Sequence, residues 1–436
     1  MSTRSTLALF AALVLWLSPA RAHDQIVVDA GRGPITVYIP DSYDPGTPLP
    51  VVLLLHGYTS SGTAMEAWLK YLSVIDEKEF IYAHPNGTTD FFGFRFWNAT
   101  NACCNLFGSP VNDSQYLSDL LDEIESSLAV DPLRVHITGH SNGGFMSYRM
   151  ACDHADRIAS IASIAGATWN NPNSCAPGQP VHALQVHGTQ DGTISYNGGS
   201  LNGSAYPSAH DSVEQWAGFA TCLIAGIISP TPLNYVSNIA GNETSVTVYA
   251  QACEPGGSSE LWTLNGAPHS PTFNPQFTSD MLDWVLGHPK TPAPLSYCSA
   301  GLSTSGCAAL LQTSGTPSLD QTSGFTVAAS GVEGAKDGLF FYGFNGAQAN
   351  AWGNGTSFQC VVPPVIRAPI MSGQGTTGVC NGFFSQDFNA YWSGAPAAKV
   401  PAPGSKVWMQ LWYRDPLNTS NQTTSLSDAL EISIDA

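Results

Sequence analysis

Apolar residues in the first 290 positions alternate between strand-like runs and helix-like stripes. Residues 51–55 read Val-Val-Leu-Leu-Leu, a continuous apolar run that is typical of a strand buried on both faces. Similar short runs start at Val135 and Val181, whereas residues 64–75 and 116–128 carry apolar positions at helical spacing. Because strands and helices alternate, the pattern predicts an α/β fold with a mostly parallel sheet and helices on both faces.

The pattern changes near residue 290. A stretch with prolines at 289, 292 and 294 interrupts helix and favours extended backbone, so we expect a linker over residues 290–296. It would separate a catalytic domain over residues 23–289 from an accessory domain over residues 297–436. In the latter, short alternating runs such as residues 407–413 lie between Gly, Ser and Asn turns, which predicts an all-β domain, most simply a sandwich. If the tryptophans of this domain are exposed, they would bind an insoluble polymer. We favour the alternative, in which they are buried and serve only as core residues.

The N-terminus is typical of an export signal. Arg4 precedes an apolar stretch over residues 7–17, and Ala20-Arg21-Ala22 forms a small-x-small cleavage site. A membrane anchor is the alternative, but 11 apolar residues are short for a bilayer. We therefore expect residues 1–22 to be a cleaved signal peptide and the protein to be secreted, to the periplasm or outside the cell.

The net charge and the composition of the chain argue against several classes of binding partner. The 436 residues include 15 Lys and Arg against 33 Asp and Glu, a net charge of −18. Such a surface repels phosphate backbones and anionic lipids, so neither nucleic acid nor a membrane surface is an expected partner. No apolar run of about 18 residues follows the first 22, which argues against a multi-span membrane protein. Nothing in the sequence indicates an oligomeric state.

Ten cysteines in an exported chain predict disulfides. Pairing neighbours along the chain gives Cys152–Cys175, Cys222–Cys253, Cys298–Cys307 and Cys360–Cys380. The adjacent Cys103 and Cys104 either bridge each other or pair elsewhere. A metal site is the weaker interpretation, because CxxC pairs are absent and the eleven histidines are scattered. We expect no metal and no organic cofactor.

The strongest chemical signal is Gly139-His140-Ser141-Asn142-Gly143. It follows the strand-like run at Val135 and precedes a helical pattern over residues 143–151. This strand, turn and helix context is what the nucleophile-elbow motif requires, since small residues let the turn close tightly around the serine. Ser141 is therefore the predicted nucleophile.

A serine nucleophile needs a base, and the base needs a group that orients it. Asp191 follows the run at Val181 and is the predicted acid, while His269 follows a strand-like run over residues 260–264 and is the predicted base. His210 and His288 are the other downstream histidines. One lies in a segment that enters a helix and the other beside the linker, so both fit the role less well.

The oxyanion would be held by backbone N–H groups. Tyr58 lies just after the run at 51–55 and Asn142 directly after the nucleophile, the two places from which these donors are expected. His56 is interpreted as a structural histidine beneath the site. Trp97, on a loop with further aromatics and the paired cysteines, is a candidate for stacking on substrate; the alternative is a packed core aromatic.

These motifs in combination resemble the secreted polyhydroxybutyrate depolymerase and feruloyl esterase family over residues 24–288. The segments that carry the resemblance are Leu55-His56-Gly57-Tyr58, Trp97-Asn98-Ala99-Thr100 with Cys103-Cys104, Gly139-His140-Ser141-Asn142-Gly143-Gly144, His187-Gly188-Thr189-Gln190-Asp191 and His269. The resemblance implies an α/β-hydrolase fold and a Ser141, Asp191 and His269 triad that acts on carboxylic esters without a cofactor.

The sequence thus favours a serine ester hydrolase that acts on a small ester or an ester-bearing polymer, of the polyhydroxyalkanoate, feruloyl or acetylxylan kind. A serine peptidase on the same fold is one alternative, although only about 28 residues precede the first core strand, too few for the large N-terminal propeller such enzymes usually carry. A non-catalytic extracellular polymer-binding protein is the other. The ester itself is not determined by the sequence.

Overall fold

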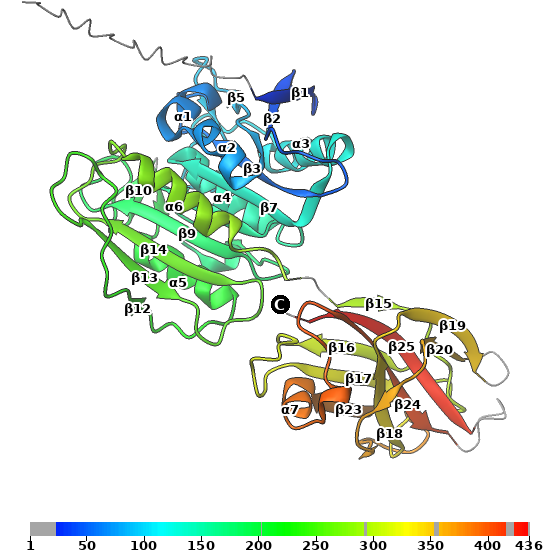
Figure 1. The fold of residues 1–436 in the computed structure, drawn as a ribbon. Coiled ribbons are helices and arrows are strands. Elements are labelled where there is room, and N and C mark those ends of the chain that lie inside the picture. The colour runs from blue at the N-terminus through cyan, green and yellow to red at the C-terminus, as the bar shows by residue number, and fades with distance from the viewer. Residues whose placement is uncertain (1–22, 202, 292–293, 353–356, 416–422, 435–436) are drawn as a thin grey trace, which may run out of the picture.

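The computed structural model describes residues 23–201, 203–291, 294–352, 357–415 and 423–434 (Figure 1). The predicted signal peptide, residues 1–22, lies outside them. Within the described residues, no helix combines the length and apolar character needed to cross a bilayer.

A ten-stranded sheet organises the N-terminal part of the chain (Figure 1). Its spatial order is β1 (Asp24–Val28), β2 (Ile35–Ile39), β4 (Ile81–Ala83), β3 (Leu49–Leu55), β7 (Val130–His140), β8 (Ser160–Ile164), β9 (His182–Gly188), β14 (Ser258–Leu264), β13 (Thr244–Tyr249) and β12 (Ile227–Ile228). From β4 to β14 neighbouring strands run parallel, and both ends of the sheet are antiparallel. The predicted mostly parallel α/β-hydrolase sheet is confirmed.

Helices cover both faces of this sheet, as the alternation along β3 shows. Val51, Leu53 and Leu55 pack into one core with α3 (Asp113–Ser127) and α4 (Asn142–Asp153). Val52 and Leu54 pack into the opposite core with α1 (Gly62–Leu69), α2 (Ile75–Lys78) and α6 (Pro275–Leu286). A further helix, α5 (Ala209–Phe219), packs against β9 and β14. The continuous apolar run at 51–55 is therefore explained by burial on both sides of the strand.

The helix predicted over residues 64–75 is interrupted. It ends at Leu69, where Lys70 adopts a left-handed conformation (φ 58°), and a 3-10 turn over Tyr71–Ser73 precedes α2. The Glu66 carboxylate accepts hydrogen bonds from the backbone N–H groups of Tyr71 and Leu72, both at 3.2 Å. These hydrogen bonds satisfy the first backbone amides of the 3-10 turn and so stabilise the break in the helix. The spacing of apolar residues alone does not predict such a break.

Two sheets pack face to face in residues 295–434, called the tail below. One contains β15 (Leu295–Tyr297), β25 (Thr424–Ser433), β24 (Lys406–Arg414), β18 (Asp337–Gly343) and β21 (Ile366–Arg367), with β22 (Met371–Ser372) also paired to β18. The other contains β16 (Leu310–Ser314), β17 (Thr326–Val332) and β23 (Gly382–Asp387), and β19 (Ala347–Trp352) with β20 (Ser357–Val361) forms a hairpin. Side chains of both sheets and of α7 (Phe388–Ser393) share one core, which is the packing of a sandwich.

The predicted linker is shorter than residues 290–296. Lys290 is buried, and its ammonium group donates to the backbone oxygen of Ala155, while β15 already begins at Leu295. Residues 292 and 293 lie outside the described part of the chain.

All ten cysteines form disulfides. Cys152–Cys175 and Cys222–Cys253 match the predicted pairs, and Cys103 is joined to Cys104. The two tail predictions are wrong, because the bridges there are Cys298–Cys360 and Cys307–Cys380. Proximity along the chain fails there because the sandwich brings residues 62 and 73 positions apart into contact.

Candidate active site

Ser141 lies in the single-residue turn between β7 and α4. Its backbone has φ 55° and ψ −119°, a combination that a non-glycine residue adopts only under strain. The Ser141 N–H donates to the carbonyl of Ile164 at the end of β8, at 2.8 Å, which ties the turn to the neighbouring strand. The structure therefore places Ser141 in the geometry of a nucleophile elbow.

The glycines of the motif are there because backbone segments touch. A Cβ on Gly139 would lie 2.3 Å from the carbonyl oxygen of Gly143, and one on Gly143 would lie 2.2 Å from that of Leu55. Both distances are far inside van der Waals contact. The close crossing of β7, α4 and β3 thus requires glycine on either side of the serine.

Asp191 lies just beyond the end of β9, with a buried carboxylate. One oxygen accepts from the backbone N–H groups of Thr193 and Ile194, each at 2.8 Å. The other lies 2.7 Å from Nδ1 of His269 and 3.2 Å from Nε2 of His187. Burial works against ionisation, but these hydrogen bonds hold the pKa of Asp191 well below its ordinary value. The carboxylate is therefore ionised near neutral pH.

His269 reaches Asp191 because their two loops are in contact. The strands that precede them, β9 and β14, are parallel neighbours. Between the loops, the Gln190 N–H donates to the Ala267 carbonyl at 3.0 Å and the Gly266 N–H donates to the Thr189 hydroxyl at 2.8 Å. The structure brings Asp191 and His269 together as the sequence predicts.

The two rival histidines are elsewhere. His210 contacts Glu214 and Tyr249 on the half-exposed side of α5. His288 follows α6 and stacks on Trp284, with ring centroids 4.0 Å apart. Neither contacts Asp191 in the described structure.

His140 also belongs to the site, although no sequence pattern singled it out as a functional residue. Its Nε2 lies 3.0 Å from the backbone oxygen of His269, and the two rings are 4.8 Å apart. The Trp68 ring meets His140 edge-on at 4.8 Å, and its indole N–H donates to the carbonyl of Pro271 at 3.1 Å. Burial lowers the pKa of His140 to about 4, so a neutral imidazole donates to that carbonyl at neutral pH. Two aromatic side chains thus hold the loop that carries His269.

The predicted oxyanion donors flank the serine. Asn142 is the first residue of α4, where a backbone N–H has no intrahelical acceptor. No hydrogen bond from the Tyr58 N–H is found among the described residues. A Cβ on Gly57 would lie 3.3 Å from Cβ of Ser141, so this loop passes directly beside the nucleophile. This geometry agrees with backbone N–H donors from Tyr58 and Asn142 beside the nucleophile. That these two groups bind the oxyanion stays a prediction.

His56 supports that loop. Its Nε2 accepts from the Gly87 N–H at 2.9 Å, and its Nδ1 lies 2.8 Å from the Gly57 carbonyl, so the neutral tautomer with a proton on Nδ1 satisfies both. Burial lowers its pKa to about 4, which keeps it neutral. This is the arrangement expected of a structural histidine.

Trp97 does not fit the stacking interpretation, because its side chain is fully buried. The indole N–H donates to the His56 carbonyl at 3.0 Å. Its backbone N–H donates to Oδ1 of Asn142 at 2.7 Å, and its carbonyl accepts from Nδ2 at 2.9 Å. The core alternative holds: Trp97 locks the loop beneath the predicted oxyanion donors.

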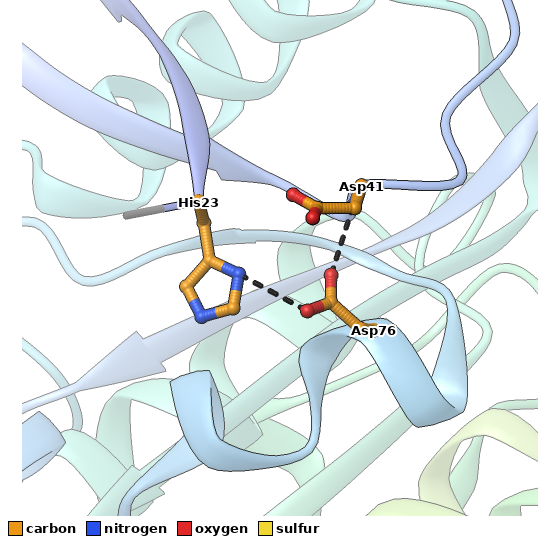
Figure 2. A group of neighbouring side chains, drawn as sticks. All are labelled: His23, Asp41 and Asp76. Atoms are coloured by element: carbon orange, nitrogen blue, oxygen red, sulfur yellow. Dashed lines mark hydrogen bonds and ion pairs between the residues drawn. The ribbon is translucent and has the colours of Figure 1, made fainter. Parts of the chain in front are cut away.

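One group of side chains with metal-ligand chemistry is found within the described residues. His23, Asp41 and Asp76 offer ligand atoms that lie within 4.8 Å of one another (Figure 2). Nδ1 of His23 is 3.4 Å from Asp76, which also accepts from the backbone N–H of Asp41 at 2.8 Å. The group lies at the surface: His23 directly precedes β1, Asp41 lies in the turn after β2 and Asp76 is in α2, and none of the three belongs to the elements that carry Ser141, Asp191 or His269. We assign it no catalytic role.

The known proteins that this chain resembles are esterases and a poly(3-hydroxyalkanoate) depolymerase. Residues 31–220 match a family described as putative esterase. The bifunctional acetylxylan esterase/xylanase of Neocallimastix patriciarum is 25% identical over 56% of this chain and 31% of its own length. Feruloyl esterase B of Piromyces equi is 26% identical over 54% of this chain and 42% of its own. Poly(3-hydroxyalkanoate) depolymerase C of Paucimonas lemoignei is 29% identical over 29% of each chain.

The matches span less than half the length of these relatives. Among solved structures, the acetyl xylan esterase of Aspergillus awamori aligns with 61% of this chain and 99% of its own, at 17% identity and a TM-score of 0.42. Residues 31–220 are thus similar to the putative esterase family, and the curated relatives that match are esterases and a depolymerase.

Proposed function

We propose that this protein is a secreted serine hydrolase of carboxylic esters, acting on esters that are linked to a polymer. Two observations carry the proposal: the strained elbow backbone of Ser141, and the 2.7 Å contact between Nδ1 of His269 and the ionised carboxylate of Asp191. The named relatives are esterases and a depolymerase, which supports the same reaction class. Five disulfides support an oxidising compartment.

The residues would divide the reaction as follows. Oγ of Ser141 attacks the ester carbonyl carbon while Nε2 of His269 takes the hydroxyl proton. Asp191 holds Nδ1–H and stabilises the imidazolium that forms. The negative oxygen of the tetrahedral intermediate is held by the backbone N–H groups of Tyr58 and Asn142.

Collapse of this intermediate releases the alcohol, which receives the proton from Nε2 of His269, and leaves the acyl group on Ser141. Water then gives a proton to the same nitrogen and attacks the acyl carbon. The second collapse releases the carboxylic acid and returns the proton to Oγ of Ser141. No cofactor takes part in these steps.

An exposed apolar patch beside the site supports a polymeric substrate. We call it the aromatic rim; its side chains are 41% to 86% exposed. The rim consists of Phe91, Phe92, Phe94, Leu106 and Phe107. Phe92 meets Phe91 and Phe107 edge-on, with centroids 5.3 and 5.4 Å apart, so the patch is contiguous. A contiguous exposed apolar patch on a soluble protein marks a contact surface.

The rim is attached to the predicted oxyanion loop. The Tyr58 hydroxyl donates to Asp90 at 2.6 Å, and the other Asp90 oxygen accepts from the backbone N–H groups of Phe92 and Phe94, both at 2.9 Å. The Thr59 N–H donates to the Arg95 carbonyl at 2.9 Å. A polymer that lies on the rim would therefore be held next to the catalytic serine. Because the rim is apolar throughout, we propose a substrate with an apolar acyl or polyester portion.

The proposal is tested with Ser141→Ala and a matched exposed serine, Ser126→Ala. Hydrolysis of 4-nitrophenyl acetate should disappear in the first variant and persist in the second, with unchanged circular dichroism in both. A fluorophosphonate should label the wild-type chain and not Ser141→Ala. Retained turnover in Ser141→Ala would refute the assignment, and a wild-type chain that neither turns over ester nor accepts the label would favour a binding protein.

Substrate choice is tested separately with methyl ferulate, acetylated xylan and a polyhydroxybutyrate film. The rim predicts turnover of the film or the feruloyl ester above that of acetylated xylan. Preference for acetylated xylan would leave the hydrolase intact and remove the role given to the rim.

A further inference from the structure

The tail contains a groove that none of the chemistry above uses. It has a volume of about 230 Å3 and lies on the face of the sheet of β18, β24 and β25 that is turned away from the sandwich core, beside the β19–β20 hairpin. Phe340 and Tyr342 of β18 point into the sandwich core, whereas Leu339 and Phe341 belong to a separate cluster on the other face. The groove is therefore not a packing defect of the core.

Strand register builds its floor. Leu339 of β18 is the direct partner of Trp412 of β24, which in turn is the direct partner of Leu426 of β25. Directly paired residues project to the same face, so these three form one apolar row across three strands. Trp352 of β19 also lines the groove, and its indole N–H donates to the Thr424 hydroxyl at 3.0 Å, which fixes the ring.

One charged group lies at the edge of this apolar floor. Arg367 of β21 is the direct partner of Phe341 and lines the groove. Among the described residues, no hydrogen bond or ion pair to its guanidinium is found, whereas Lys336 and Lys406 of the same tail pair with Glu333 and Glu431. The Arg367 guanidinium is therefore available to an anionic group bound in the groove.

We propose that the tail groove binds an apolar organic carboxylate, with its apolar body against Trp352 and Trp412 and its carboxylate on Arg367. The planar guanidinium fork matches a carboxylate with two parallel hydrogen bonds. Aromatic and aliphatic walls suit a ring or short hydrocarbon chain. Gln359 is the other polar side chain of the lining, too little hydrogen-bonding capacity for a neutral sugar.

The groove also has the right size and access. Its volume suits a molecule of the size of cinnamate, and Ile370 on its wall is 72% exposed, so the opening faces solvent. An ester hydrolase releases a carboxylic acid, so the groove would hold a compound of the product's class. Binding there does not depend on hydrolysis at Ser141.

The test uses the full chain carrying Ser141→Ala, so that no ester is consumed. Sodium cinnamate is titrated while the indole N–H signals of Trp352 and Trp412, assigned with Trp352→Phe and Trp412→Phe, are followed by NMR. Cinnamate should shift both signals. Methyl cinnamate, which lacks the charge, and sodium acetate, which lacks the apolar body, should each bind at least tenfold more weakly.

Arg367→Gln should weaken cinnamate binding at least tenfold, and Arg367→Lys should fall between the two because it keeps the charge and loses the fork. Lys399→Gln is the matched control, an exposed cation of the same tail outside the groove, and should bind as the parent does. Unshifted indole signals, equal affinity for methyl cinnamate, or unchanged binding in Arg367→Gln would each overturn the proposal. Because the indole signals report only on the tail, these outcomes are independent of whether the wild-type chain hydrolyses esters.

Discussion

Replacing His140 tests how the loop that carries the predicted base, His269, is held in position. In His140→Leu the Nε2–H that lies 3.0 Å from the His269 carbonyl is lost, while apolar contact with Trp68 is kept. His140→Gln retains an N–H donor of similar reach. Since His140 contacts the backbone of the base and not the substrate, it acts as a positioning residue.

The magnitude follows from the lost hydrogen bond. A buried carbonyl without its donor costs about 1–3 kcal/mol. If the His269 loop relaxes to recover that energy, the imidazole moves away from its productive position, and the loss appears in the transition state. At about 1.4 kcal/mol per factor of ten, kcat should fall by roughly 5- to 150-fold. Because the pKa of His140 is lowered to about 4, no change of charge contributes near pH 7.

The assay is hydrolysis of 4-nitrophenyl acetate between pH 5 and 9, with kcat and KM determined separately. For His140→Leu we expect a fall in kcat with little change in KM and a shifted acid limb of the pH profile, because the environment of His269 changes. His140→Gln should recover most of the loss, and His210→Leu, at a half-exposed histidine, should leave all three quantities unchanged. Wild-type kcat in His140→Leu, or a loss that tracks thermal stability without a change in the pH profile, would refute the reasoning.

Three further predictions concern the rim, the elbow and acid stability. The double variant Phe92→Ser, Phe107→Ser should lose most activity on a polyhydroxybutyrate film and keep that on 4-nitrophenyl acetate; equal losses on both would contradict the rim's role. Gly143→Ala should destabilise the protein by more than about 3 kcal/mol, because its Cβ would lie 2.2 Å from a backbone oxygen, whereas Gly178→Ala meets nothing within 4 Å and should unfold in urea like the wild type. Burial lowers the pKa of His136 to about 3, so between pH 6.5 and 3 the unfolded chain takes up a proton at this residue that the folded chain does not. As the pH falls through this range, the unfolding free energy of the wild type should therefore decrease by about 1.4 kcal/mol per pH unit more than that of His136→Gln. Equal slopes in the two proteins would rule this out.

Local patterns predicted much of the fold and the site. The run at 51–55 and the motif around Ser141 are readable because strand periodicity and a tight turn depend on residues close in sequence. Asp191 and His269 follow from the same logic, since each comes directly after a core strand.

What the sequence did not reveal depends on tertiary contact. A tryptophan at position 97 looks the same in the sequence whether it faces substrate or core. Only the full burial of its side chain, with the indole N–H donating to the His56 carbonyl, decides the matter. His140 carries no pattern of its own, because its partner lies 129 residues away. Glu66, which ends α1 by capping the next turn, is likewise indistinguishable from a solvent-facing helical glutamate.

The two tail disulfides interleave along the chain: Cys307 lies between Cys298 and its partner Cys360, but pairs with Cys380, beyond both. On the proposed export route, which begins at the N-terminus, Cys298 and Cys307 meet oxidant before either native partner has emerged. A bridge between those two would have to be exchanged before the sandwich could close, so maturation of the tail should depend on a thiol–disulfide isomerase or on a delay in oxidation until residue 380 has emerged.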